Sequence, residues 1–250
     1  MLDAILEMLP TGKRLVEPFA GGGALFLNSQ FKSYLINDIN QDLISFYNAV
    51  KTGGTAFIEA CKSCFSEENN NKDKFFQLRD LFNKGNPRPP ELFLYLNRHG
   101  FNGLCRYNQK EEFNVPFGDY EKPYFPEMEL KYLYKLSKKV RFTCNDFRIT
   151  FKNLRPGDVV YCDPPFLPLS PTSNFTSFSA GGFTIDDQID LAHRAETAPV
   201  PVLISNHDVP MARDIFSKAT VINSVPCRRS IAASGNSRGK VNELLALYAK

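Results

Sequence analysis

The sequence predicts an α/β fold in which a mainly parallel sheet is interrupted by an inserted, mainly helical module. Residues 14–40 contain a short apolar run, a glycine cluster, a helical pattern and a second apolar run ending in an acid. This order is typical of the first βαβ unit of a nucleotide-binding sheet. Apolar runs of the same kind return only after residue 138, in KKVRFTCNDF, GDVVYCDPPF and APVPVLISNHD. We therefore predict a sheet domain of residues 1–51 and 139–250 around a module of residues 52–138.

Local patterns predict the individual elements. Helical spacing occurs in ALFLN, QDLISFYNAVK and IDDQIDLAHRAE, whereas SYLINDIN is typical of a strand. Residues 52–92 are polar and mostly helical in pattern, with interruptions at SEENNNKD and NKGNPRPPE. Residues 93–126 contain nine aromatic residues among Asn, Gly and Pro, which predicts irregular loops or hairpins. The final segment VNELLALYAK fits a strand or a helix.

Composition limits the class of protein. The chain has 250 residues, of which 43% are hydrophobic and 23% charged, as in an ordinary globular protein. The net charge of +3 is too small to indicate nucleic-acid binding. The N-terminus carries acids in place of the basic start of a signal peptide, and no apolar run is long enough to span a membrane. We expect a cytoplasmic protein with free cysteines, no metal and no membrane contact.

The glycine cluster of EPFAGGGALF is the first candidate site. Gly21, Gly22 and Gly23 allow a loop to approach a ligand closely, although a plain strand–helix turn explains them equally well. Phe26 stands where the dinucleotide fingerprint requires Gly or Ala, and the Gly-Lys-Ser/Thr of a phosphate loop does not follow. Asp38, fifteen residues beyond Gly23, can accept hydrogen bonds from both hydroxyls of a ribose. Together they predict an adenosine-containing cofactor without a pyrophosphate.

A second candidate site is the tetrapeptide Asp163-Pro164-Pro165-Phe166, which follows the apolar run VVYC. The two prolines stiffen the backbone and remove two donors, so carbonyl groups are exposed. Asp163 and the Pro164 carbonyl could accept both protons of an amine, while Phe166 stacks on a flat ring. In isolation the tetrapeptide could be a simple turn, but its place at the carboxyl edge of the sheet favours a site for an amine-bearing ring.

The third feature is the aromatic and basic segment LYLNRHGFNGLCRYNQKEEFNVPFGDYEKPYFP. Aromatic, Asn and Arg side chains are suited to base stacking, base-edge hydrogen bonds and phosphate contacts. The alternative is an aromatic core beneath a long loop. The stretch RRSIAASGNSRGK is a second candidate for phosphate contacts, and the three His residues are expected to be structural.

Over almost its whole length the sequence resembles Dam-type DNA adenine methyltransferases. The blocks that carry the resemblance are LVEPFAGGGALFLN, INDINQDLISFYN, LFLYLNRHGFNGLCRYN, EFNVPFGDYEKPYFPE, VVYCDPPF, VLISNHD and RRSI…KVNELLALY. The resemblance implies a Rossmann-like methyltransferase sheet with an inserted target-recognition domain, S-adenosyl-L-methionine as methyl donor, and a flipped-out adenine of double-stranded DNA as acceptor. It also implies GATC as the target, a monomer, and a bacterial cell or a phage-infected bacterium as the location.

The family's functional positions can be transferred to this sequence wherever its motifs match. The cofactor site would comprise Glu17, Pro18, Phe19, Ala20, Gly21, Gly22, Gly23, Asp38, Ile39, Asp146, Phe147 and Asp163. The catalytic loop would comprise Asp163, Pro164, Pro165 and Phe166. The DNA contacts would come from Phe101 as the intercalating aromatic and from Asn102, Leu104, Arg106, Pro116 and Tyr120. Further candidates for DNA contact are Asn114 and, from the basic stretch, Arg228, Arg229, Asn236, Arg238 and Lys240.

These residue types suit the chemistry that the resemblance implies. The lone pair of an adenine amine is delocalised into the ring, so the amine is a poor nucleophile. Hydrogen bonds to Asp163 and the Pro164 carbonyl would favour a pyramidal nitrogen aimed at the sulfonium methyl group. Positive charge then develops on the nitrogen, and Asp163 stabilises it.

The chain departs from the family pattern at three places. Phe166 replaces the usual Tyr, which predicts weakened but surviving catalysis. A W-A-G-G-K segment, which would precede the glycine loop and help to close the cofactor pocket, is not found, and this predicts weaker cofactor binding. Asp119 stands where a basic residue is common, so DNA binding is expected to be weaker or altered.

Two alternative functions follow from the same residues. A relative that binds DNA without methylating it would account for the first two departures. The Asp-Pro-Pro loop would also permit methylation of the exocyclic amine of cytosine.

Overall fold

The computed structural model describes residues 1–169, 182–228 and 240–250, which form two compact units. The first unit contains Met1–Ile39 and the described residues from Thr143 onward, and the second contains Asn40–Phe142. These limits differ from the boundaries expected at 51/52 and 138/139. The first boundary differs because helix α3 (Gln41–Ser63), which is kinked at the non-helical Gly54, lies wholly in the second unit.

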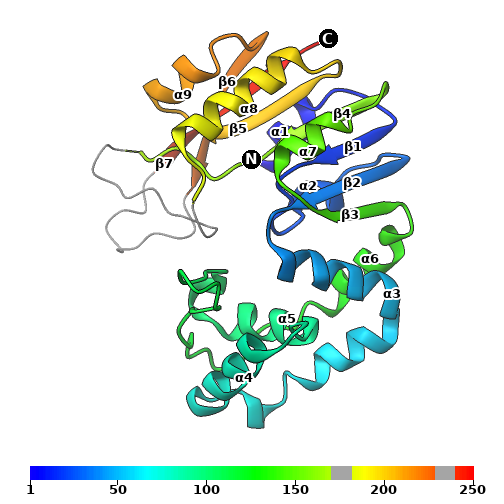
Figure 1. Cartoon of the computed structure of the whole chain (residues 1–250), viewed down its shortest axis with the longest axis vertical. Helices are drawn as coiled ribbons and strands as arrows, with labels where there is room; N and C mark the ends of the chain where they lie inside the picture. Colours follow the sequence, from blue (N-terminus) through cyan, green and yellow to red (C-terminus); the bar gives the residue numbers. More distant parts are fainter. Residues whose placement is uncertain (170–181, 229–239) are drawn as a thin grey trace. The chain divides into compact units, whose positions relative to one another are not determined.

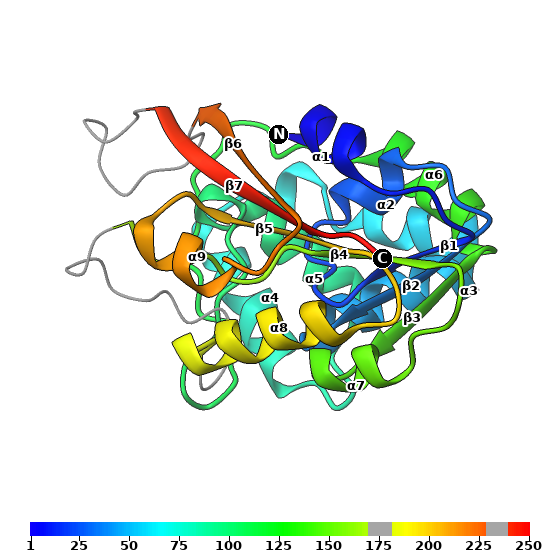
Figure 2. The same cartoon turned by 90° about the horizontal axis from the view of Figure 1, so that it is seen from above.

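The first unit is built on an α/β sheet with strand order β3-β2-β1-β4-β5-β7-β6 (Figures 1 and 2). Strands β1, β2, β4 and β5 are parallel, whereas β7 is antiparallel to both of its neighbours. The strand bounds are β1 Arg14–Glu17, β2 Ser33–Asp38, β3 Val140–Cys144, β4 Asp158–Cys162, β5 Val202–His207, β6 Val221–Arg228 and β7 Lys240–Tyr248. The final segment of the chain, for which a strand or a helix was expected, is therefore strand β7.

Helices cover both faces of this sheet, so its central strands are apolar on both sides. Figure 2 shows α7 (Phe147–Lys152), α8 (Ile185–Thr197) and α9 (Pro210–Ile215) on one side and α1 (Leu2–Met8) and α2 (Ala24–Asn28) on the other. On the α7–α9 side, Val16, Val160 and Ile204 belong to one buried cluster with side chains of these helices. Burial on both faces is the usual reason for near-continuous apolar runs in parallel strands.

The chain reverses its direction of winding between β1 and β4. Strand β2 lies on one side of β1, while β4 and then β5 lie on the other side. Loops that leave the carboxyl ends of two such neighbouring strands run to opposite faces and open a crevice. The glycine loop follows β1 and the Asp163 loop follows β4, so both candidate segments begin at this place.

An ion pair fixes the opposite end of the same two strands. Arg14 and Asp158 are the first residues of β1 and β4 and are paired in the register. The Arg14 Nε and Nη2 atoms donate to the two Asp158 oxygens at 2.8 and 2.6 Å, and the Arg155 amide donates to Asp158 at 2.8 Å. Asp158 is 3% exposed, so this bidentate pair is largely removed from water.

The second unit is mainly helical, as predicted. It contains α3, η1 (Glu67–Asn69), α4 (Lys72–Lys84), α5 (Pro90–His99), η2 (Phe101–Gly103) and α6 (Glu127–Ser137). Figure 1 shows α3, α4, α5 and α6 as coiled ribbons. The expectation of irregular structure from residue 93 is wrong for the first seven residues, which belong to α5. Every side chain from Leu92 to Leu96 is buried, and this packing overrides the poor helix propensity of the aromatic residues.

Residues 100–126 are irregular, as expected, apart from η2 and two isolated bridges. The bridges join Gly100 to Phe117 and Tyr107 to Phe113. Among the described residues, no helix is both long and apolar enough to cross a membrane.

Candidate active site

The glycine loop and Asp38 lie together at the carboxyl edge of the sheet. The Gly21 amide donates to the Asp38 carboxylate at 3.0 Å, and the Ala20 amide donates to the Asn37 carbonyl at 2.8 Å. Gly21 has φ of 47°, a left-handed conformation that favours glycine. A Cβ atom built at Gly21 or Gly22 would meet no atom within 4 Å. Within this unit, the loop therefore leaves open space beside its backbone.

Glu17, the last residue of β1, is a buried acid beneath this loop. It is 2% exposed, and its Oε1 atom has no hydrogen-bond partner among the described residues. Burial raises the pKa of Glu17 well above its ordinary value, the negative charge of Asp163 adds to the rise, and a hydrogen bond from the Phe26 amide opposes it. The protein therefore holds Glu17 in a neutral form above the pH at which a free carboxyl ionises.

We expect Glu17→Gln to stabilise the protein at pH 8 more than at pH 5. A raised folded-state pKa means that the folded chain retains a proton which the unfolded chain releases, so stability falls as pH rises through that interval. Glutamine mimics the neutral carboxyl and removes this loss. Urea unfolding of the wild type and the variant at both pH values measures the difference. The exposed Glu59→Gln serves as control, and an equal effect of both substitutions would contradict the buried, neutral Glu17.

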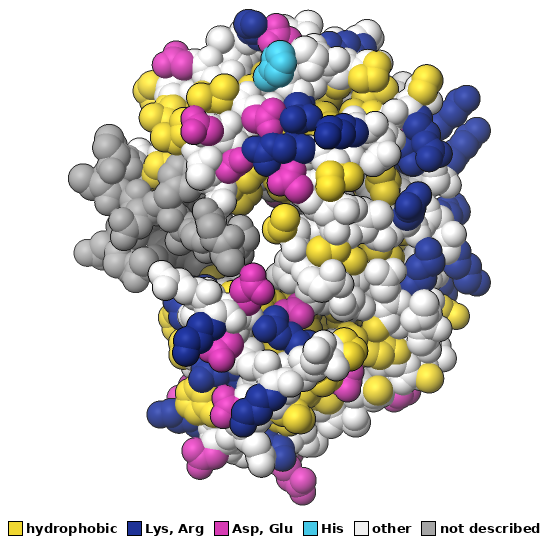
Figure 3. Space-filling model, in the orientation of Figure 1, with side chains coloured by type: hydrophobic (Ala, Val, Ile, Leu, Met, Phe, Trp, Pro, Cys, Tyr) yellow, Lys and Arg dark blue, Asp and Glu magenta, His cyan; other side chains and the backbone are white. Residues whose placement is uncertain are grey.

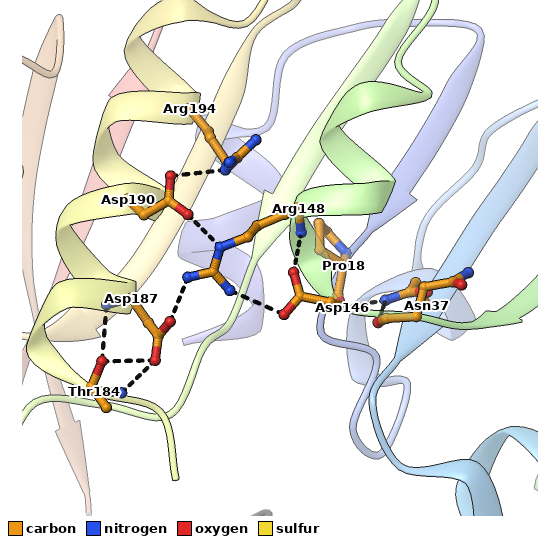
Figure 4. A network of polar contacts seen from close by, with 9 residues as sticks. Pro18, Asn37, Asp146, Arg148, Thr184, Asp187, Asp190 and Arg194 are labelled. Carbon is orange, nitrogen blue, oxygen red and sulfur yellow. Dashed lines mark hydrogen bonds and ion pairs between the residues drawn. The ribbon is translucent and has the colours of Figure 1, made fainter. Parts of the chain in front are cut away.

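Asn37 is a structural residue of the site that the sequence did not reveal. Its side chain is fully buried, donates to the carbonyls of Pro18 and Asn145 at 3.0 and 2.8 Å, and accepts a hydrogen bond from Thr143 at 2.9 Å. It thereby ties strand β2 to the segments that follow β1 and β3 (Figure 4). The only signal in the sequence was an amide placed next to Asp38 within an apolar strand.

The Asp163 loop is held by three consecutive residues of β5 and by one residue of α8. The Asn206 Oδ1 atom accepts from the Leu167 amide at 2.9 Å, and a His207 ring nitrogen lies 2.6 Å from the Leu167 carbonyl. Gln188 donates to the Pro165 carbonyl at 2.7 Å. Within the described residues, no donor reaches the Pro164 carbonyl. Pro164 itself is buried.

The side chains of this loop differ in their surroundings. Asp163 keeps access to solvent, yet the surrounding protein raises its pKa above the ordinary value, and a hydrogen bond from Ser205 at 2.6 Å opposes that rise. Phe166 is half-buried, and its ring and the His207 ring form a T-shaped pair with centroids 4.9 Å apart. The importance of Ser205, Asn206 and His207 was not evident from the sequence.

Asp146 and Phe147 begin helix α7, next to an ion-pair network. Asp146 caps the helix by accepting from the Arg148 amide at 2.8 Å, and it pairs with the Arg148 guanidinium at 3.0 Å. The same guanidinium reaches Asp187 and Asp190 of α8, each at 2.5 Å (Figure 4). On the face shown in Figure 3, acidic and basic side chains lie next to one another over the first unit.

Phe147 presents little free surface for a ligand. It is 5% exposed and packs against Phe19 and Phe183, with ring centroids 5.4 and 5.6 Å away. The Arg148 guanidinium lies 4.5 Å from its ring centroid. By contrast, Ile39, the residue after Asp38, is 58% exposed.

In the second unit, the expected DNA-contacting residues gather around η2 and the loop after it. Phe101 is 48% exposed, and Asn102 has φ of 54°, with its amide donating to the Tyr120 hydroxyl at 2.8 Å. Arg106 Nε donates to Asn114 Oδ1 at 2.8 Å. Leu104 is half-buried, and Pro116 is exposed with its carbonyl bound to the Phe101 amide. Asp119 is exposed and also has a positive φ, of 52°.

The remaining candidates for DNA contact cannot be placed as side chains. Arg228 and Lys240 end β6 and begin β7 and are paired in the register, but only their backbone is described. Arg229, Asn236 and Arg238 lie outside the described residues.

The aromatic residues of residues 92–126 serve two purposes. Tyr95 and Phe113 are at most 1% exposed and belong to the core of the second unit. Phe101, Tyr120 and Tyr124 are between 38% and 58% exposed. The two interpretations of this segment, an aromatic core and an aromatic binding surface, thus apply to different side chains.

The order of the strands, with antiparallel β7 between β5 and β6, defines a Rossmann-like methyltransferase fold that carries an inserted helical unit. Residues 1–230 match the family model described as D12 class N6 adenine-specific DNA methyltransferase. The chain belongs to this family and is an adenine-specific DNA methyltransferase.

Named relatives agree with the family. The DNA adenine methylase of Serratia marcescens is 48% identical over 254 residues, which cover 99% of this chain and 94% of that protein. The DNA adenine methylases of Escherichia coli K12 and Vibrio cholerae O395 are 47% and 46% identical, each over 99% of this chain and 91% of its own length. Because the family and these relatives are adenine-specific, they favour adenine over the cytosine alternative.

Proposed function

We propose that the protein transfers the methyl group of S-adenosyl-L-methionine to N6 of a flipped-out adenine in GATC sites of double-stranded DNA. The observation that carries this proposal is the placement of two loops in one unit. The glycine loop with Asp38 and the Asp163 loop leave neighbouring strands where the winding of the sheet reverses. This is the place at which open α/β sheets bind their ligands.

Three features of the structure fit a cofactor of this kind. The missing side chains of Gly21 and Gly22 leave space beside the backbone, and the unpaired Oε1 atom of Glu17 lies beneath the same loop. Asp38 would accept the ribose hydroxyls, and the exposed Ile39 offers apolar surface to an adenine ring. Asp146 and the edge of Phe147 would complete the adenine side. When bound, the cofactor supplies an electrophilic sulfonium methyl group.

The Asp163 loop would prepare the adenine amine for attack. One oxygen of Asp163 and the Pro164 carbonyl accept the two amine protons, so the nitrogen becomes pyramidal and its lone pair is directed at the methyl donor. The negative charge of Asp163 then stabilises the positive charge that develops on nitrogen. Pro165 keeps the backbone rigid, and Phe166 provides the stacking face. Extruding the base costs a few kcal/mol, which stacking and pocket contacts offset.

The second unit would recognise the target. Phe101 is an exposed aromatic beside the strained Asn102 and is placed to stack on bases, whereas Arg106, fixed by Asn114, presents donors to a base edge. Leu104, Pro116 and Tyr120 would complete the contact, with Arg228, Arg229, Asn236, Arg238 and Lys240 as phosphate-contacting candidates. The chain would act as a monomer in the cytoplasm of a bacterium or of a phage-infected bacterium.

The decisive experiment is transfer of a labelled methyl group from S-adenosyl-L-methionine to short duplexes. A duplex with one GATC site should be labelled, and a duplex of equal composition with GTAC should not. Nucleoside analysis should find N6-methyladenine. If neither duplex is labelled at saturating cofactor while the GATC duplex is still retarded in a gel, the chain is a non-methylating binder and the proposal fails.

We expect Asp38→Ala to weaken cofactor binding by about 10-fold or more, because each hydrogen bond to a charged group contributes about 1.5–3 kcal/mol. Isothermal titration with S-adenosyl-homocysteine measures the dissociation constant. The neighbouring exposed Ile39→Val keeps the backbone and most of the apolar surface and is the matched control. Unchanged affinity in the Asp38 variant would remove Asp38 from the cofactor site.

A further inference from the structure

A buried chain of hydroxyl groups lies beneath the Asp163 carboxylate. Ser205, in strand β5, is 1% exposed, and its Oγ atom lies 2.6 Å from Asp163 Oδ1. Tyr161 of strand β4 is 4% exposed, and its hydroxyl lies 3.0 Å from the same Oγ atom. The register pairs Cys162, the last residue of β4, with Ile204 of β5. Asp163, directly after β4, and Ser205, within β5, follow this pair.

The direction of these hydrogen bonds follows from the number of protons. An ionised carboxylate accepts only, so the single hydroxyl proton of Ser205 is directed to Asp163. The longer contact from Ser205 to the Cys162 carbonyl, at 3.3 Å, is then secondary. Because the Ser205 proton is already used, the Tyr161 hydroxyl must donate to Ser205. The order of donation is therefore from Tyr161 to Ser205 to Asp163.

This series of hydrogen bonds makes the two oxygens of the Asp163 carboxylate different from each other. Oδ1 accepts the Ser205 hydrogen bond, whereas Oδ2 has no partner among the described residues. A carboxylate without the tether could rotate about its two side-chain torsions, and each immobilised side chain costs conformational entropy. In this protein the Asp163 side chain loses that entropy during folding and not during catalysis, because its partners Ser205 and Tyr161 are buried in the sheet.

We propose that Ser205, supported by Tyr161, is a positioning residue that holds Oδ1 of Asp163 and leaves Oδ2 directed at the adenine amine. This inference rests on the proposed role of Asp163 as acceptor of an amine proton. It adds a contribution of strand β5 to catalysis, made by a side chain that does not touch either substrate.

The groups around Asp163 determine how the tether should affect the pH dependence. Glu17 of β1 faces Asp163 as a buried acid, Tyr161 and Cys162 of β4 adjoin it, and Ser205 of β5 donates to it. The Ser205 hydrogen bond stabilises the charged carboxylate and opposes the rise of its pKa. Removing the hydroxyl should therefore shift the acid limb of the rate profile to higher pH.

The test is single-turnover methyl transfer to a GATC duplex with saturating cofactor. We expect Ser205→Ala to lower the rate by about 10–100-fold, the effect of a small misplacement of a reacting group, and to shift the acid limb upward. Dissociation constants for the duplex and for S-adenosyl-homocysteine should stay within about twofold. Tyr161→Phe removes only the second hydrogen bond, and we expect a loss of about 3–10-fold.

Ser137→Ala is the matched control. Ser137 is also fully buried and donates to a backbone carbonyl, that of Tyr134, but it lies in helix α6 of the second unit. The methyl-transfer rate and the pH profile of Ser137→Ala should match those of the wild type. The inference is overturned if Ser205→Ala has the wild-type rate and acid limb, or if Ser137→Ala loses as much activity. If Asp163→Ala is itself active, the failure belongs to the proposed function instead.

Discussion

Asp163→Ala should reduce the rate of methyl transfer by about 10³-fold or more in single turnover. Removing one preorganised group that stabilises developing charge costs about 10²–10³-fold, and here an acceptor for the amine proton is lost as well. Asp163→Asn keeps a neutral oxygen acceptor, so its rate should lie between those of the alanine variant and the wild type. Rapid-quench measurement of labelled methyl incorporation into a GATC duplex gives the three rates.

In this experiment, measuring the affinity for the DNA duplex distinguishes a variant that has lost catalysis from one that has lost its fold. The Asp163 variants should retain the affinity of the wild type for the duplex, because the proposed base-reading residues Phe101, Asn102 and Arg106 lie in the second unit and the substitution leaves them unchanged. A variant of the exposed Glu59, Glu59→Ala, controls for the loss of a negative charge elsewhere. Asp163→Ala with more than a tenth of the wild-type rate would exclude the proposed mechanism.

Asp158→Ala should lower the free energy of unfolding by about 3 kcal/mol. Breaking a buried ion pair by removing one partner costs about 3–5 kcal/mol, since the other charge stays behind uncompensated. Arg14 is 17% exposed, which places the effect at the lower end of that range. The pair also fixes the register at which β1 and β4 begin. Urea unfolding of the full chain, followed by circular dichroism, measures the change.

An exposed ion pair provides the comparison. Lys218 and Glu196 lie 2.9 Å apart, but their side chains are 70% and 36% exposed. We expect Lys218→Ala to change the stability by less than about 0.5 kcal/mol. If Asp158→Ala and Lys218→Ala have the same small effect, the Arg14–Asp158 pair does not stabilise the sheet as its burial indicates.

The fold could be predicted from the sequence where a pattern is local. Apolar runs that end in Glu17, Asp38 and Cys162 mark three parallel strands, because buried strands lack polar positions. Helix α5 was missed for the opposite reason. Its aromatic residues have weak helix propensity, and only their burial in the second unit, which depends on distant residues, makes the helix stable.

The candidate site likewise contains some residues that the sequence reveals and others that only the structure reveals. Gly21 and the loop from Asp163 stand out in the sequence, because glycine frees the backbone and the two prolines of the loop restrict it. Ser205 and Asn206 are ordinary residues in a strand, and their contacts with the loop join positions about 40 residues apart. No periodicity reveals such a contact. It becomes visible only when the register of β4 and β5 is known.

The anchoring of the Asp163 loop to β5 has a consequence for the response of the enzyme to heat. Gln188, Asn206 and His207 bind its backbone through side chains that are themselves part of the sheet or of α8. The loop cannot melt by itself without leaving these partners unpaired in the interior. Inactivation on warming should therefore coincide with cooperative denaturation of the sheet, with no temperature interval in which an ordered but inert enzyme accumulates.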